Sequence, residues 1–170
     1  MSEEPDAPAG RPHIQRALAV AIAVLSLLAA VNVGLGYRDH QIRQSESLRR
    51  DMVDAAREGA VNLTTIDHQQ ADEAVQRILD TSTGAFRDDF AERATGFIDA
   101  AKKAQSKSVG TVADAGLESV DGDVGRVLVA LTVMTSNRGV PERQPRAWRM
   151  RVTVTPDDDT YKVSSVEFIG

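Results

Sequence analysis

Side chains that commonly transfer protons or bind metals are scarce in this chain of 170 residues. It has no Cys and three His, and after the first forty residues only Tyr161 and His68 remain of the Tyr and His side chains. The motifs G-x-S-x-G and H-E-x-x-H and a phosphate-binding loop are absent from the sequence. Without Cys there is no disulfide framework, thiolate metal site or Cys nucleophile. The sequence therefore predicts a protein that is not an enzyme and that has no metal site or cofactor.

Aromatic side chains form a second group, suited to contact with apolar molecules. Phe86, Phe90 and Phe97 recur at i, i+4 and i+11, which places them on one stripe of a helix. Trp148 lies on a segment in which apolar and polar residues alternate, as in a half-buried strand. These four residues line a lipid pocket in one interpretation and belong to an ordinary hydrophobic core in the other. Residue types and spacing do not separate the two.

Four arginines, Arg143, Arg146, Arg149 and Arg151, lie close together in a chain whose formal net charge is -5. Arg149 and Arg151 share one face of the predicted strand and could contact a partner's acidic surface or a lipid headgroup. A solvated outer face of a sheet explains them equally well. The net negative charge argues against nucleic acid as the main partner.

A long uncharged segment covers residues 17–37, and its only residues that are not apolar are Ser26, Asn32, Gly34 and Gly36. A helix of this length spans roughly 30 Å, the thickness of the hydrocarbon core of a bilayer. A cleavable signal peptide is the alternative, but its apolar stretch is usually only about 7 to 15 residues long. We therefore expect a single transmembrane helix.

Ser26, Ala30 and Gly34 form a ridge of small residues on this predicted transmembrane helix. Small residues at i, i+4 and i+8 allow another helix to approach closely within the membrane. The ridge is thus a candidate contact with a partner protein or with a second copy of the chain. Apolar spans rich in Ala also produce such ridges without any partner.

The remaining pattern predicts an α+β protein. We expect a disordered tail at residues 1–16, a helical stalk at 38–62 and one domain at 63–170. In that domain, helices begin near Asp67 and at residue 85, and four strands follow at 107–120, 124–136, 147–155 and 161–169. Short connections imply antiparallel neighbours. The expected domain is a curled four-stranded antiparallel sheet with helices packed on its apolar face.

Three short motifs carry a family resemblance: residues 63–67 (LTTID), residues 83–86 (TGAF) and residues 163–168 (VSSVEF). With the preceding predicted anchor, they make the chain similar to the Mce-associated membrane proteins, which are encoded with Mce lipid-import transporters in mycobacteria and their relatives. Tyr161 departs from this pattern, because the family usually has Trp there. The resemblance implies a cystatin-like cone, similar to nuclear transport factor 2-like domains.

The resemblance also implies a location and a role. The N-terminus would be cytoplasmic, and the domain would lie on the outer, periplasmic side of the plasma membrane. The expected role is that of a non-catalytic accessory or scaffold subunit that stabilises an Mce transporter by contact with its subunits or permease. The alternative is a lipid-binding module that holds apolar cargo inside the cone.

Overall fold

The structure is a computed structural model that describes residues 45–169, without the side chains of residues 141–144. The expected tail, the expected span with Ser26, Ala30 and Gly34, and the beginning of the expected stalk lie outside these residues. Within residues 45–169, no helix is both long enough and apolar enough to cross a membrane. Residues from Glu46 onward form one compact unit.

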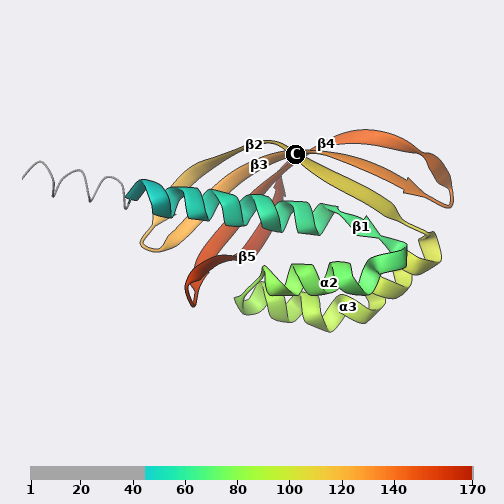
Figure 1. The fold of residues 1–170 in the computed structure, drawn as a ribbon, viewed down its shortest axis with the longest axis horizontal. Helices are drawn as coiled ribbons and strands as arrows, with labels where there is room; N and C mark the ends of the chain where they lie inside the picture. The colour runs from blue at the N-terminus through green and yellow to red at the C-terminus, as the bar shows by residue number, and fades with distance from the viewer. Residues whose placement is uncertain (1–44, 170) are drawn as a thin grey trace, which may run out of the picture. The chain divides into compact units, whose positions relative to one another are not determined.

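The sheet has five strands in the order β1-β2-β3-β4-β5, and every neighbouring pair is antiparallel (Figure 1). The strands are β1 (Ile66–Asp67), β2 (Lys107–Asp121), β3 (Val124–Asn137), β4 (Val140–Asp157) and β5 (Thr160–Ile169). The sequence predicted the last four. It missed β1, because a strand of two residues has no periodicity that a sequence pattern could show.

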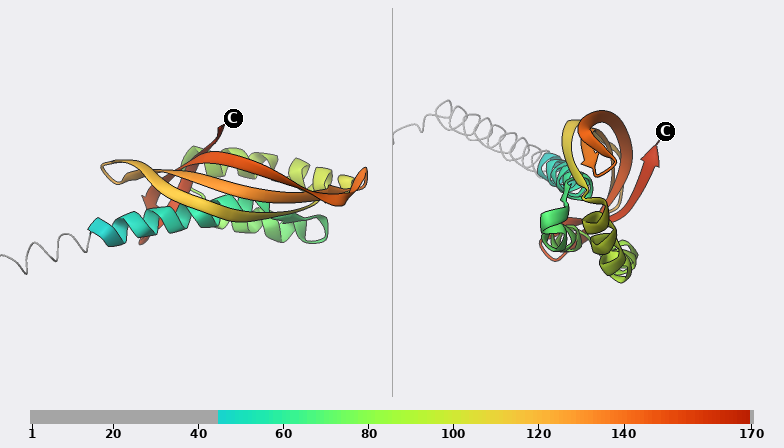
Figure 2. Two further views of the ribbon diagram at one scale, coloured as in Figure 1. Left: turned by 90° about the horizontal axis from the view of Figure 1, so that it is seen from above. Right: turned by 90° about the vertical axis from the view of Figure 1, so that its right-hand side faces the viewer.

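Helices cover one side of this sheet, and the sheet curls toward them (Figure 2). The chain is helical over residues 45–64, drawn in turquoise in Figure 1. A 3-10 turn, η1 (His68–Gln70), leads into α2 (Ala71–Asp80) and then α3 (Gly84–Ala104). The prediction of α+β structure, with helices packed on a curled antiparallel sheet, is therefore confirmed, with five strands in place of four.

The main hydrophobic core lies between the helix at residues 45–64 and the middle of the sheet. Alternate residues of β3 and β4 point into it, as the period of two requires. Its buried members are Met52, Ala56, Ala60, Val127, Val129, Leu131, Val133, Met150, Val152, Val154 and Val163. Ala56 and Ala60 are completely buried, and their small side chains allow the helix to lie close to the strands.

This packing changes the interpretation of the expected stalk at residues 38–62. Met52, Ala56 and Ala60 recur every four residues, so they form one face of the helix, and that face is buried against the sheet. Over the described residues, the helix is therefore part of the domain core. The sequence pattern alone shows that a helix has an apolar face but not what covers that face.

Residues 140–145 contain two prolines, so the sequence pattern predicts a loop there. In the structure, strand β4 already begins at Val140. Pro145 instead lies opposite Met134 of β3. Strand β5 pairs with β4 only from Arg149 onward, so this part of β4 has a strand on one side only. Proline is tolerated at such an edge, because its missing N–H removes no bond on the open side.

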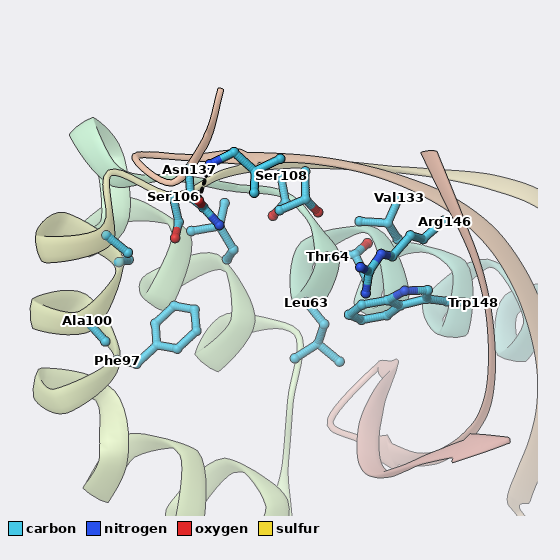
Figure 3. A pocket seen from close by; sticks show the side chains of 15 residues that line it. Leu63, Thr64, Phe97, Ala100, Ser106, Ser108, Val133, Asn137, Arg146 and Trp148 are labelled. Carbon is cyan, nitrogen blue, oxygen red and sulfur yellow. Dashed lines mark hydrogen bonds between the residues drawn. The ribbon is translucent and has the colours of Figure 1, made fainter. Parts of the chain in front are cut away.

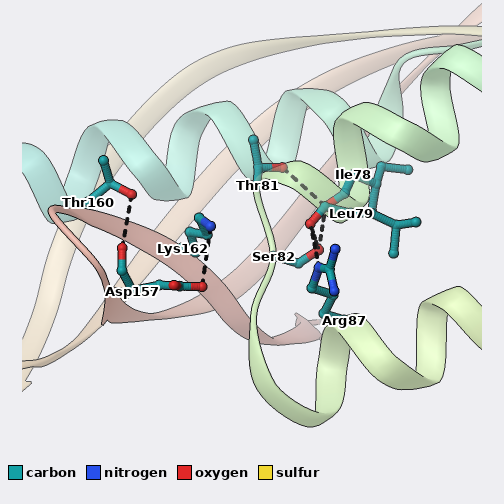
Figure 4. Close-up of polar contacts among 8 residues, drawn as sticks. All are labelled: Ile78, Leu79, Thr81, Ser82, Arg87, Asp157, Thr160 and Lys162. Atoms are coloured by element: carbon teal, nitrogen blue, oxygen red, sulfur yellow. Dashed lines mark hydrogen bonds and ion pairs between the residues drawn. The ribbon is translucent and has the colours of Figure 1, made fainter.

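The connection between α2 and α3 is fastened to β5 by two backbone hydrogen bonds, and Figure 4 shows the bonds that the side chains of Thr81, Ser82 and Arg87 make to the end of α2. The N–H of Thr83 donates to the carbonyl of Val163 at 2.9 Å, and the N–H of Val163 donates to the carbonyl of Thr81 at 2.9 Å. The hydroxyl of Ser82, which is 1% exposed, donates to the carbonyl of Ile78. The bond of Ser82 satisfies a carbonyl in the last turn of α2, and the two backbone bonds hold the connection between the helices at a defined place on the sheet.

Candidate functional site

An open pocket of about 580 Å³ lies at one end of the domain, between the end of the first helix, the second half of α3 and the inner face of the sheet (Figure 3). Its apolar lining includes Leu63, Ile66, Phe97, Ala101, Val133 and Trp148. In Figure 3, Phe97 and Trp148 lie on opposite sides of the pocket, with Leu63 between them. The volume falls within the range of roughly 300–1,000 Å³ that is typical of small-molecule sites.

The polar groups of the pocket are hydroxyls, one amide and one guanidinium. They belong to Thr64, Ser106, Ser108, Thr135, Asn137 and Arg146. Two of them are already engaged: Thr64 Oγ1 donates to the carbonyl of Ala60 at 2.7 Å, and Asn137 Oδ1 accepts from the N–H of Gly139 at 2.9 Å. No Asp or Glu is among the described lining residues. The pocket is thus apolar, with one cation on its wall.

The alternation of side chains along β4 explains why the cation, Arg146, lies on the wall of the pocket. Arg146 and Trp148 are two residues apart, and they lie opposite Val133 and Leu131, the buried residues on the inner face of β3. Both side chains therefore point to the inner face of the sheet, where the pocket lies. Arg146 is exposed, and within the described part of the chain no ion pair involves it.

The aromatic stripe predicted from the sequence divides between three environments. Phe86 packs against the main core. Phe90 and Phe97 pack against a second core cluster, with their ring centroids 5.8 Å apart, and only Phe97 also lines the pocket. A spacing of eleven residues covers about 16 Å along a helix, so the ends of the stripe meet different neighbours. Of the four predicted lipid-pocket residues, the pocket brings together Phe97 and Trp148.

Trp148 also contacts an aromatic residue that the sequence analysis did not select. The ring of Phe168 lies edge-on to that of Trp148, with centroids 5.4 Å apart, and Phe168 is 67% exposed. Phe168 of β5 lies opposite Met150 of β4. Because Met150 and Trp148 are two residues apart on β4, Phe168 is on the same face of the sheet as Trp148. The apolar surface of the pocket therefore continues to the edge of the sheet.

The two arginines predicted to bind a partner differ in their surroundings. Arg151 forms a bidentate ion pair with Glu118, at 2.7 and 2.9 Å, and bonds Glu167 at 3.1 Å. Arg149 is exposed, and among the described residues no ion pair occupies it. Of these two, only Arg149 has a guanidinium without an ion pair among the residues that the structure describes.

The ion pair predicts a pH dependence. The hydrogen bond from Arg151 lowers the pKa of Glu118 below its usual value of 4.5. A lowered folded-state pKa means that this stabilisation is complete above about pH 4.5 and is lost as the pH falls through the folded-state pKa. Arg151→Gln is therefore expected to lower the midpoint of urea unfolding near pH 7, and the difference from wild type should shrink near pH 3.

The matched control is Arg149→Gln, which removes a neighbouring cation from the same face of β4. Its midpoint should stay close to wild type at both pH values, because no carboxylate of the described chain is paired with Arg149. A difference for Arg151→Gln that is unchanged near pH 3 would show that Glu118 is not the group being titrated.

A polar cluster beside the pocket has a structural role. The carboxylate of Asp67 accepts from Nζ of Lys107 at 2.8 Å and from the N–H of Gln69 at 3.0 Å, and both bonds lower its pKa. The second bond caps the turn η1, at the place where the sequence predicted a helix to begin. No three His, Asp or Glu side chains gather as metal ligands would within the part of the chain that the structure describes.

This geometry defines a class of protein: an α+β domain with helices on a curled antiparallel sheet. The periplasmic domain of DotI has the same fold, with a TM-score of 0.57 and 13% identity over 69% of this chain and 91% of that one. An IcmL-like type IV secretion system protein from Legionella pneumophila gives 0.55 and 13% identity over 69% and 88%. TraE gives 0.52 and 12% identity over 65% and 88%.

The sequence gives the family. Residues 14–170 match the family described as "Uncharacterized protein Rv1363c/MT1408-like", and the chain belongs to it. The protein Rv1363c of Mycobacterium tuberculosis is 33% identical over 153 residues, which cover 90% of this chain and 59% of Rv1363c. The chain thus spans less than two thirds of that relative. The resemblance to Mce-associated membrane proteins stays a prediction.

Proposed function

We propose that this protein is a non-catalytic accessory subunit of the cell envelope that associates with an Mce-type lipid-import transporter and stabilises it. Residues 17–37 anchor it in the plasma membrane, with the N-terminus cytoplasmic and the domain on the outer side. The fold shared with the periplasmic domain of DotI and with an IcmL-like type IV secretion system protein supports a role in an envelope assembly. The motifs at residues 63–67 and 83–86 support the Mce link.

The observation that carries this proposal is that the interior of the domain consists of a packed core and an open pocket at one end. Side chains fill the middle of the cone, where Ala56, Val127 and Met150 are completely buried. The polar groups of the remaining pocket are hydroxyls, an amide and a guanidinium. Such groups hydrogen-bond a ligand, whereas general acid–base catalysis needs a group such as a carboxyl or an imidazole.

Purification of the tagged full-length protein in a mild detergent tests this proposal. We expect Mce or permease subunits to co-purify, and we expect Gly34→Ile to reduce their recovery severalfold, because a β-branched side chain would block close helix contact at the small-residue ridge. A matched control is Leu28→Ile, which changes an apolar residue of the same segment outside the ridge. Failure to recover any transporter subunit with wild type would contradict the proposal.

The pocket favours a second function, the binding of apolar cargo. It is large enough for a small ligand, it remains open, and Phe97 and Trp148 both line it. Cargo binding is compatible with an accessory role at a lipid transporter, since the two use different parts of the molecule. Identification of lipid extracted from the same purified protein tests it: stoichiometric lipid supports cargo binding, and a lipid-free pocket in material purified from membranes contradicts it.

A further inference from the structure

We propose that the pocket binds a single-chain lipid with an anionic headgroup, which Arg146 recognises while the chain lies between Trp148 and Phe97. This inference rests on the second proposed function, the binding of apolar cargo, and adds the chemistry of the ligand and its orientation. It assigns Arg146 a role different from that of the neighbouring arginines, with which it forms a cluster in the sequence.

The charge of the pocket carries the first step. Arg146 lines it, no described residue is paired with Arg146, and no described lining residue is acidic. Arg149 is also unpaired among the described residues, but only Arg146 of these two lines the pocket. A guanidinium forms charge-assisted hydrogen bonds with an anionic oxygen, and these are shorter and roughly twice as strong as hydrogen bonds between neutral groups.

Free hydroxyls add to the headgroup site. Ser106, Ser108 and Thr135 line the pocket, and no hydrogen bond of their side chains occurs within the described chain. In Figure 3 Ser106 lies beside Asn137, away from Arg146, and Ser108 lies between them, so of these two serines Ser108 is the better placed to donate to the same anion, directly or through water. The amide oxygen of Asn137 does not compete, because it already accepts from the N–H groups of Gly139 and Val140 at 2.9 Å each.

The apolar part of the pocket fits one chain. It extends from Trp148 past Leu63 to Phe97 and the alanines of α3, so an elongated apolar group can lie along it (Figure 3). The volume of about 580 Å³ is that of a site for a small ligand, in the middle of the usual range of roughly 300–1,000 Å³. Because Arg146 and Trp148 share one face of β4, the headgroup and the start of the chain are recognised by neighbouring side chains.

The single Trp of the chain provides a direct test. Full-length protein in an uncharged detergent is titrated with doxyl-labelled stearate at about pH 8 and, separately, with its methyl ester, while Trp fluorescence is recorded. Both probes have the same chain, and only the first is anionic. We expect saturable quenching by both and a roughly tenfold tighter binding of the acid, the ratio typical of one charge-assisted hydrogen bond.

Three variants identify the group responsible. Arg146→Gln should weaken binding of the acid about tenfold and leave the ester unchanged. Arg146→Lys should restore part of the preference, because it retains the charge. Arg149→Gln is the matched control: it removes an exposed cation from the opposite face of the same strand and should change neither affinity. Circular dichroism checks that each variant is folded.

The outcomes separate this inference from the function on which it rests. Equal affinity for acid and ester, or an unchanged preference in Arg146→Gln, overturns the headgroup assignment while saturable quenching still supports cargo binding. The absence of saturable quenching by either probe overturns both. Preference for the acid that disappears in Arg146→Gln and persists in Arg149→Gln establishes the site.

Discussion

Replacing Leu131 with alanine is expected to lower the free energy of unfolding by about 2–5 kcal/mol. Leu131 is 2% exposed and lies in the middle of β3, between Val112 of β2 and Trp148 of β4. Its truncation leaves a cavity that residues on two neighbouring strands and the first helix would have to fill. Urea unfolding followed by far-ultraviolet circular dichroism measures the loss.

Leu128→Ala is the matched control, because it makes the same truncation on the same strand but on the opposite face. Leu128 is 40% exposed, so its removal should cost less than about 1 kcal/mol. The contrast depends on the curled sheet having one buried and one solvated face. Equal losses for the two variants would show that the outer face of β3 is also covered.

The alternation along β3 and β4 made much of this architecture predictable. The alternation of residues 147–155 predicts that Val152 and Val154 share a face with Met150, and all three are completely buried. Residues 127–131 are apolar without alternation, which predicts a strand covered on both sides, and β3 is the middle strand of five. These assignments succeeded because a period of two is local information, which the sequence contains in full.

The pocket was not predictable in the same way, because its walls come from distant parts of the chain. Leu63 belongs to the first helix, Phe97 to α3 and Trp148 to β4. The stripe of Phe residues indicated an apolar face but not which part of it would remain uncovered. That depends on where α2 and α3 are fastened, and the bonds of Thr81 and Thr83 to Val163 set this position.

The position of Arg146 on the inner face of the sheet was predictable from the sequence. It is two residues before Trp148, so the alternation that assigned Trp148 to the inner face also assigns Arg146 to it. The cluster of arginines in the sequence does not show this difference, because Arg149 and Arg151 have the same charge as Arg146 but point to the other face of the sheet. Arg146 lines the pocket, whereas Arg149 and Arg151, the two arginines predicted to contact a partner or a headgroup, do not.

The second large effect is expected where the first helix ends against β2. Gly110 lies under Thr64, which is 3% exposed and whose hydroxyl is fixed by its bond to the carbonyl of Ala60 at 2.7 Å. A Cβ on Gly110 would lie against Oγ1 of Thr64 and 2.7 Å from its Cβ. Gly110→Val therefore forces the end of the helix away from the sheet, and we expect a loss of about 1–3 kcal/mol or more of unfolding free energy.

The matched control for this substitution is Gly116→Val, on the same strand. A Cβ at Gly116 meets no atom within 4 Å, so valine should be neutral there or slightly stabilising in a strand. Because Thr64 also lines the pocket, Gly110→Val should weaken the saturable quenching of Trp148 by the doxyl lipid, whereas Gly116→Val should not. A loss of stability without any change in quenching would show that the helix end moves without reshaping the pocket.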